Sequence, residues 1–404
     1  MKMAVLKFGG TSVSSKSSRE KVIEKILEKY DQGYKTLVVV SAMGRSGEPY
    51  ATDTLMELVK PIAINNREMD LLLSCGEIIS VIILANEILQ KGYKVSILTA
   101  NDAGIETDSN FGNAEIINIY TDNILEKIEK NNITIVAGFQ GKTKEGEITT
   151  LGRGGSDITA IALAKALNSK YVEIFTDVDG IMTADPNIIN NAKILKYMCY
   201  SEVYFLAKNG ASIIHPKAIK IAQESNIPLI IRNTYSNSEG TYIGEINKEF
   251  IQNRNKLFNE KKITSLTYKK NKSQIIISSI DKDYNLGNLI EKIIQKNINI
   301  DIISIMQDKK VFTIDVQDEN KLVSILKKEQ IEFEIIQDCC KLSILGYRID
   351  DNPKILAKII KAFSKENINI LQASDPYNTF SCLIKEKDIN KALLALHEEF
   401  KLYA

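Results

Sequence analysis

Short apolar segments alternate with amphipathic ones through the first half of the chain, and this alternation limits the possible folds more than any other feature. Residues Thr36–Val40 form a β-branched run typical of a strand buried on both faces. Residues Glu20–Tyr30 instead repeat apolar side chains at helical spacing. Strands and helices in this order form βαβ units, so the sequence predicts a mostly parallel sheet covered by helices on both faces. We expect strands over residues 4–8, 36–40, 94–98, 133–137, 171–175 and 228–231, and helices over 20–30, 76–90, 115–129, 158–167 and 201–209.

The C-terminal part of the chain carries an internal repeat. Asn297–Ile300 recurs as Asn367–Ile370, and further positions match at the same shift. Each copy has the order strand, helix, two strands, helix, strand, which predicts two ferredoxin-like βαββαβ units in tandem. Their cores are small, so we expect them to pack on each other or on a second chain. The expected boundaries are a first domain over 1–245, a linker over 246–262, and repeats over 263–335 and 336–404.

Composition excludes several classes of protein. The 52 Lys and Arg residues balance 51 Asp and Glu residues, which argues against a chain that coats nucleic acid or an anionic membrane. The longest apolar run, Ile78–Ala85, is shorter than the roughly 18 residues of a membrane span, and Met1–Phe8 lacks the pattern of a secretory signal. Five cysteines without a C-x-x-C pair favour free thiols in a reducing cytoplasm, and two histidines exclude a multi-histidine metal site.

A lysine and two glycines end the first expected strand. In Lys7–Val13, the glycines would let backbone N–H groups approach phosphate oxygens, and Lys7 would supply a positive charge for them. A plain strand–helix turn is the alternative, and the lysine makes it the weaker one.

A second glycine-rich segment, Leu151–Asp157, contains a single arginine. The planar guanidinium of Arg153 can bind a carboxylate through two parallel hydrogen bonds, so we expect an anion site here. Ser156 or Asp157 could also cap the helix that follows, and both interpretations can hold together.

Three aspartates lie within Phe175–Pro186, directly after an expected strand and so at the carboxyl edge of the sheet, where α/β sheets bind ligands. They could hold Mg²⁺, contact a ribose or nucleotide, or simply form a turn-rich loop; their spacing does not match a calcium-binding loop. Glu77 stands at the start of an expected helix, where a carboxylate is more often only a partner of the helix dipole. His215, before Pro216, is expected in a turn rather than as a general base.

Taken together, these motifs resemble those of aspartate kinase, in the amino acid kinase family, and the resemblance covers the whole chain. The segments that carry it are Lys7–Val13, Ser41–Gly44, Thr52–Asp53, Ser74–Glu77, Leu151–Asp157, Phe175–Pro186 and Gly210–Pro216. The C-terminal tandem resembles paired ACT domains, which are small amino-acid-binding modules. The chain looks like a monofunctional enzyme of the diaminopimelate-sensitive type, on the segments Ser41–Asp53, Ile370–Ser374 and Leu396–Phe400.

The resemblance implies transfer of the γ-phosphoryl group of ATP to the side-chain carboxylate of L-aspartate, the first step towards lysine, diaminopimelate, threonine and methionine. It implies Mg²⁺ held mainly by the nucleotide phosphates, without a metal site in the protein. The implied catalytic residues are Lys7, Arg153 and Asp157. The implied substrate-binding residues are Thr52, Glu77, Arg153, Gly154, Gly155 and Ser156. The implied nucleotide-binding residues are Lys7, Phe8, Gly9, Gly10, Ser41, Thr176, Asp177, Met182, Thr183, Ala184, Asp185, Pro186 and Asn187.

The resemblance also implies a role for each central residue. Lys7 would neutralise the transferring phosphoryl group, and Asp157 would orient Lys7. Arg153 would bind the α-carboxylate of aspartate and Glu77 its α-ammonium, which replaces the helix-dipole interpretation of Glu77. No general base is needed, since the acceptor carboxylate is already ionised.

Two residues depart from the family pattern. The chain has Ser212 and Asn187 where the family usually has lysine and arginine. Both positions are expected near the nucleotide, so ATP binding could weaken by about 1–3 kcal/mol for each lost charged hydrogen bond. Lys217, Lys193 or another cation could compensate.

The first ACT unit keeps Gly287 in the loop before its first helix, whereas Asp351–Lys354 in the second unit has no glycine. We therefore expect an inhibitory amino acid, diaminopimelate before lysine or threonine, to bind in the first unit. Its expected ligands are Asp283, Asn285, Leu286, Gly287, Asp301, Ile302 and Ile303. A homodimer joined through the ACT units is expected.

Two other functions stay open. The chain could be another amino acid kinase that acts on glutamate or carbamate, although the ACT tandem and the pairing of Glu77 with Arg153 argue against it. It could also be a catalytically impaired subunit that senses an amino acid, because of Ser212 and Asn187. The intact Lys7 favours activity.

Overall fold

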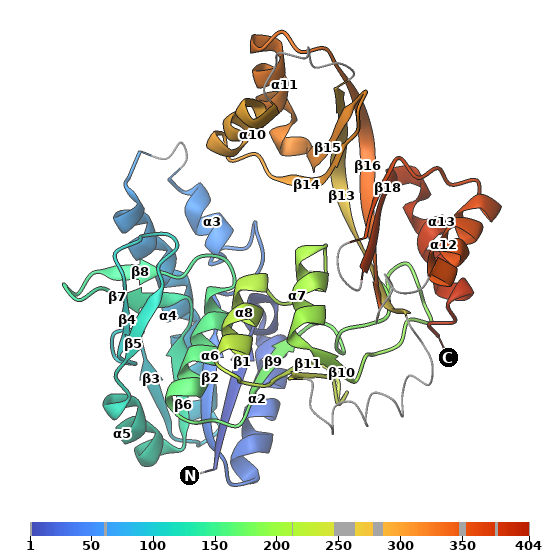
Figure 1. Cartoon of the computed structure of the whole chain (residues 1–404). Coiled ribbons are helices and arrows are strands. Elements are labelled where there is room, and N and C mark those ends of the chain that lie inside the picture. The colour runs from blue at the N-terminus through green and yellow to red at the C-terminus, as the bar shows by residue number, and fades with distance from the viewer. Residues whose placement is uncertain are drawn as a thin grey trace. The chain divides into compact units, whose positions relative to one another are not determined.

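The computed structural model describes residues 2–59, 63–211, 213–245, 263–277, 286–346, 353–375 and 379–403. They form two compact units (Figure 1). The first unit comprises residues 1–181, 194–208 and 212–257, and the second comprises 182–193, 209–211 and 258–404. The expected linker, 246–262, lies outside the described residues.

The first unit is built on an eight-stranded sheet. Its order is β10 (Tyr197–Cys199), β12 (Thr241–Gly244), β11 (Leu229–Asn233), β9 (Val172–Thr176), β1 (Met3–Phe8), β2 (Lys35–Val40), β6 (Ile133–Ala137) and β3 (Val95–Leu98). All neighbours run parallel except β11 and β12, which confirms the mostly parallel sheet. The central strands β2 and β6 are buried almost throughout, as their β-branched runs predict.

Helices cover both faces of this sheet. They are α1 (Gly10–Val13), α2 (Lys16–Asp31), α3 (Thr52–Glu57), α4 (Asn66–Gln90), α5 (Asp122–Asn131), α6 (Gly155–Ala166), α7 (Tyr200–Lys208) and α8 (Pro216–Glu224). Helices α2 and α4 pack on the face that carries Leu6 and Val38. Because side chains alternate along a strand, Lys7 points to the other face, where it pairs with Asp157 of α6.

Helix α4 spans 25 residues and begins earlier than expected, at Asn66. Within the described part of the chain it is the one helix whose length and composition would suit a membrane span. Half of that stretch is nevertheless buried inside the unit, where Leu84 and Ile88 join the core. Asp70 and Glu77 are also buried on this helix, so α4 is the core helix of a globular domain.

The prediction of a helix over 115–129 is wrong for its first residues, 115–121. Ile116–Ile119 forms strand β5, and α5 begins only at Asp122. The β-branched residues at the start favour a strand, whereas the buried helical positions begin with Ile124 and Ile128. A small second sheet has the order β5, β4 (Ile105–Thr107), β7 (Gln140–Lys142) and β8 (Ile148–Thr150).

The second unit holds both repeats on one six-stranded antiparallel sheet, which confirms the two ferredoxin-like folds. Its order is β14 (Ile300–Ile305), β15 (Lys310–Asp315), β13 (Ile263–Ile277), β16 (Phe333–Gly346), β18 (Thr379–Lys385) and β17 (Gln372–Ser374). Its helices are α10 (Leu286–Gln295), α11 (Glu319–Lys328), α12 (Pro353–Lys365) and α13 (Ile389–Glu399), with short 3-10 turns η1 (Val316–Asp318) and η2 (Glu386–Asp388).

The two repeats interlock through the long strands β13 and β16. Ile277, at the end of β13, belongs to the core of the first repeat, while Ile263, at its start, belongs to the core of the second. The register of β13 on β16 shifts between Lys269 and Lys272, between those two stretches. The domain boundaries expected from the sequence stay a proposal. Each long strand contributes residues to the cores of both repeats.

Candidate active site

A cavity of about 680 Å³ opens in the first unit. Its lining comes from β1, the loop after β2, α3, α4 and the turn that leads into α6. The fold gathers here nine residues expected from separate motifs, namely Lys7, Ser41, Thr52, Glu77, Arg153, Gly154, Gly155, Ser156 and Asp157.

Lys7 and Asp157 form an ion pair on the cavity wall. Lys7 Nζ lies 2.7 Å from Asp157 Oδ1, and the two side chains are only 12% and 10% exposed. Asp157 belongs to the first turn of α6, so the pair fixes the ammonium relative to the helix. A Cβ built on Gly9 would lie 3.7 Å from Lys7 Nζ, so this fixed positive charge lies beside the glycine-rich turn.

The turn after β1 packs tightly on the loop after β2. A Cβ on Gly10 would lie 2.6 Å from the carbonyl oxygen of Ala42 and 2.7 Å from that of Gly44, which leaves no room for a side chain. The amide of Gly44 also donates to the carbonyl of Gly10 at 3.0 Å. The ring of Phe8 stacks on Phe175 in the core, with centroids 4.7 Å apart, so Phe8 can offer a ligand only its backbone.

Backbone geometry explains the glycines around Arg153. Gly152 and Gly154 have φ angles of 72° and 76°, a region that favours glycine. Gly154 is the N-cap residue of α6, and no side chain caps this helix. The capping interpretation of Ser156 and Asp157 is therefore wrong, which leaves Asp157 to pair with Lys7.

Glu77 lies in the middle of α4, so its interpretation as a helix-dipole partner is wrong. The residue is 2% exposed, and burial raises the pKa of its carboxyl from 4.5 to about 8. Its Oε1 accepts a hydrogen bond from the amide of Ala42 at 3.0 Å, whereas Oε2 has no hydrogen-bond partner. A buried carboxyl with a free oxygen on a cavity wall suits a cationic group of a ligand.

Asp70 is a site residue that the sequence analysis missed. It is fully buried, lines the cavity, and accepts hydrogen bonds from the hydroxyl and amide of Thr150, at 2.7 and 2.8 Å, and from the amide of Gly112 at 2.9 Å. Burial raises the pKa of its carboxyl, although these hydrogen bonds oppose the shift. Its place about two helical turns before Glu77 is the signal that could have identified it.

Thr176 and Asp177 lie at the carboxyl end of β9, as expected. The hydroxyl of Thr176 donates to Asp177 Oδ1 at 3.1 Å, and Arg45 donates to Asp177 Oδ2 at 2.7 Å. Asp179 accepts from the side chain of Asn233 at 2.9 Å, which holds the loop after β9 against the end of β11. Over the residues that the structure describes, no group of three His, Cys, Asp or Glu side chains could hold a metal ion.

The remaining expected nucleotide residues, Met182–Asn187, belong to the second unit. There, Thr183 Oγ1 lies 3.1 Å from His397 Nε2, and the hydroxyl of Tyr268 donates to Asp185 at 2.9 Å. The expected nucleotide residues therefore divide between the two units.

Ser212, one of the two residues that stand where the family pattern has a cation, lies outside the described part of the chain. Lys217 Nζ donates to Asn113 Oδ1 at 3.0 Å and lies 3.5 Å from the carbonyl oxygen of Leu151. Its ammonium therefore supports the start of the Arg153 turn. His215 is the N-cap residue of α8, which agrees with its expected place in a turn.

The expected effector residues belong to the first repeat. Asp283 and Asn285 lie outside the described residues. The others begin α10 (Leu286 and Gly287) or lie on β14 (Asp301, Ile302 and Ile303).

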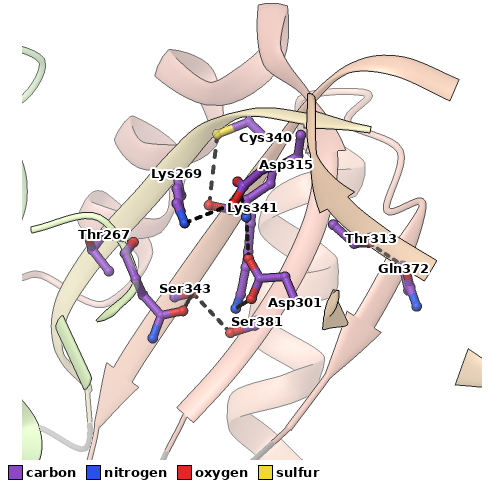
Figure 2. Close-up of polar contacts among 12 residues, drawn as sticks. Thr267, Lys269, Asp301, Thr313, Asp315, Cys340, Lys341, Ser343, Gln372 and Ser381 are labelled. Atoms are coloured by element: carbon purple, nitrogen blue, oxygen red, sulfur yellow. Dashed lines mark hydrogen bonds and ion pairs between the residues drawn. The ribbon is translucent and has the colours of Figure 1, made fainter. Parts of the chain in front are cut away.

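Asp301 belongs to a cluster of ion pairs that crosses the sheet of the second unit (Figure 2). Lys272 Nζ, on a side chain 1% exposed, lies 2.6 Å from Asp301 Oδ2 and 2.7 Å from Asp315 Oδ1. Lys341 also pairs with Asp301, and Lys269 lies 3.6 Å from Asp315. Burial alone would raise the pKa of Asp301, but Lys341 and Lys272 outweigh it and lower that pKa. The Asp301 carboxylate is thus held ionised by lysines from two strands.

Comparison with known proteins places this site in a family. The sequence profile of the amino acid kinase family matches residues 2–233, and that of the ACT domain matches residues 334–398. Aspartokinase 1 of Bacillus subtilis is 38% identical over 405 residues, which cover 100% of each chain. The chain belongs to the aspartokinase family. The resemblance of the motifs to aspartate kinase is thereby confirmed.

Solved structures of family members share this fold. E. coli aspartokinase III in complex with aspartate and ADP superimposes with a TM-score of 0.75 at 21% identity, over 98% of this chain and 99% of that chain. Aspartate kinase of Clostridium acetobutylicum gives a TM-score of 0.76 at 24% identity, over 98% and 100%. The E. coli enzyme has also been solved with lysine and aspartate. At these identities the likeness concerns the fold, and it confirms a kinase sheet followed by ACT-like ferredoxin folds.

Proposed function

We propose that this chain transfers the γ-phosphoryl group of MgATP to the side-chain carboxylate of L-aspartate, forming 4-phospho-L-aspartate. The reaction would be the cytoplasmic first step towards lysine, diaminopimelate, threonine and methionine. The observation that carries the proposal is the buried carboxyl of Glu77, which has one oxygen without a hydrogen-bond partner and belongs to the same cavity as Arg153 and the Lys7–Asp157 pair. The family, and the aspartate and ADP bound to the E. coli relative, support it.

Two groups of opposite charge suit the two charged ends of an amino acid. Arg153 would bind the α-carboxylate through its planar fork, and Glu77 would bind the α-ammonium. Thr52, Ser156 and the backbone of Gly154–Gly155 line the same cavity and would add hydrogen bonds. With both ends held, the side-chain carboxylate is the group left to react, and its positioning supplies a large part of the catalysis.

The transfer itself needs a fixed positive charge more than a base. The acceptor carboxylate is ionised at neutral pH, so no proton has to be removed. Lys7, held by Asp157, would neutralise the transferring phosphoryl group beside the backbone of Gly9 and Gly10. Mg²⁺, held mainly by the nucleotide phosphates, would supply further charge neutralisation when bound.

Contacts to the rest of the nucleotide are proposed for two further segments. Ser41 lines the cavity, Thr176 is the last residue of β9, and Asp177 follows it. A role for Met182–Asn187 rests on the sequence motif alone.

Regulation is proposed to act through the ACT repeats. An amino acid, diaminopimelate before lysine or threonine, would bind the first repeat near Gly287 and Ile303 and inhibit the enzyme. The lysine bound to the E. coli relative supports an effector of this class. A homodimer joined through the ACT repeats is part of the same proposal.

An assay that couples ADP release to a dye tests the function. We expect turnover with MgATP and L-aspartate, none with L-glutamate or carbamate, and inhibition by one of meso-diaminopimelate, lysine and threonine. Asp157→Asn leaves Lys7 unfixed and should lower kcat, whereas Asp122→Asn, at an exposed helix position, should not.

Two other results would each identify an alternative function. Turnover with glutamate or carbamate, but not with aspartate, would identify another amino acid kinase. No turnover, together with a Tm raised by an amino acid, would identify a sensor subunit.

A further inference from the structure

An arginine from the loop after β2 forms an ion pair across the end of β1. The guanidinium of Arg45 donates to Asp177 Oδ2 at 2.7 Å. Asp177 follows β9, and the order of the sheet places β1 between β9 and β2. The ion pair therefore joins the two loops that flank the turn after β1, where Gly9 and Gly10 lie.

The backbone that carries Arg45 is fixed against that turn. The amide of Gly44 donates to the carbonyl of Gly10 at 3.0 Å, and Gly44 has a φ of +90°, a conformation that favours glycine. The amide of Arg45 donates to Glu48 Oε2 at 2.7 Å. The side chain of Arg45 is 70% exposed, so the loop presents an exposed guanidinium beside the turn.

A negatively charged ligand can displace Asp177 from Arg45. Groups this exposed attract each other weakly, because water screens their charges. A polyphosphate carries several negative charges, and a guanidinium can bind two of its oxygens through its planar fork. A polyphosphate at the turn after β1 would therefore compete well with Asp177 for Arg45.

We propose that Arg45 binds a phosphate group of the nucleotide, and that Asp177 holds it beside the turn until the nucleotide arrives. The inference rests on the proposed function and adds a phosphate-binding residue to it. Arg45 supplies a positive charge to a chain that has Asn187 and Ser212 where the family pattern has two cations.

Arg45→Ala in the full chain tests the proposal, with Arg67→Ala as the matched control. Arg67 is also an exposed arginine in an ion pair, 2.7 Å from Glu147, but it belongs to helix α4 and not to a loop beside the turn after β1. For Arg45→Ala we expect the Kd of ADP, measured by calorimetry, and the KM of ATP to rise about tenfold or more, the loss for one charge-assisted hydrogen bond. The KM of aspartate should stay within about twofold, because that substrate has other ligands. Arg45→Lys, which keeps the charge without the fork, should give intermediate values, and Arg67→Ala wild-type values.

Three results would overturn the role of Arg45: an unchanged ADP affinity in Arg45→Ala, an equal loss in Arg67→Ala, or an increase confined to the KM of aspartate. An unchanged Tm of Arg45→Ala, expected for so exposed a side chain, excludes unfolding as the cause of a loss. The proposed function can fail separately, if the wild-type chain binds ADP but shows no aspartate-dependent turnover. The ADP measurements then still decide the role of Arg45.

Discussion

The affinity of the enzyme for aspartate should rise with pH because of Glu77. Burial raises the pKa of this carboxyl to about 8 in the free protein. At about pH 7 only about a tenth of the molecules then carry it ionised, whereas at about pH 9 nearly all of them do. Since the α-ammonium of aspartate pairs with the ionised form, we expect kcat/KM for aspartate to rise about tenfold over this range and then to level off.

Initial rates at low aspartate and saturating MgATP, from about pH 6 to about pH 9, measure this profile. Glu77→Gln is the matched variant, because it keeps the shape of the side chain and removes the titration. We expect a flat profile and a much higher KM for aspartate from this variant. A flat wild-type profile, or a Glu77→Gln profile that rises like the wild type, would refute the assignment of Glu77 to the ammonium.

The same titration affects folding in the opposite direction. The ordinary pKa of 4.5 applies to the unfolded chain, so between that pH and about pH 8 the folded protein keeps a proton that the unfolded chain releases. The free energy of unfolding should therefore fall as the pH rises through this window, by about 1.4 kcal/mol per pH unit and about 5 kcal/mol in all. Urea unfolding should find wild type losing stability relative to Glu77→Gln as the pH rises, and saturating aspartate should reduce that loss.

Four further variants test other parts of the molecule. Arg153→Lys keeps the charge but not the fork, so the KM of aspartate should rise about 10–100-fold in steady-state kinetics; a larger effect on ATP would contradict the role of Arg153. Lys272→Met removes a buried cation between two carboxylates and should lower the free energy of unfolding by about 3 kcal/mol. Lys269→Met, at a more exposed pair, should lower it by less than about 1 kcal/mol, and equal losses in urea unfolding would contradict the importance of burial. Ile303→Ala, at an exposed position of β14, should weaken feedback inhibition in a dose–response assay, and unchanged inhibition would refute the effector placement.

The main sheet and the charged core of the site could be predicted because they depend on local patterns. The β-branched run at Thr36–Val40 specifies a strand buried on both faces wherever it occurs. Gly152 and Gly154, on either side of Arg153, are needed by a turn with positive φ angles, which is a property of the local backbone. Local patterns of this kind also allowed the family resemblance to be recognised.

The parts that could not be predicted depend on distant contacts. Asp70 is bound by Gly112 and Thr150, which lie 42 and 80 residues away in sequence. Burial by tertiary packing raises the pKa of the Glu77 carboxyl, and no residue near Glu77 in the sequence indicates that burial. Arg45 gains its position only when β2 and β9 flank β1 in the sheet.

The strands shared by the two C-terminal repeats have a consequence for protein engineering. The start of β13 pairs with the end of β16, so a cut between the repeats, near residue 335, separates partners of one ladder. It also removes Ile263 and Leu266 from the core that holds Leu342. A chimera or a natural gene fusion can therefore gain or lose the two repeats only together. One repeat alone would lack part of its sheet and of its core.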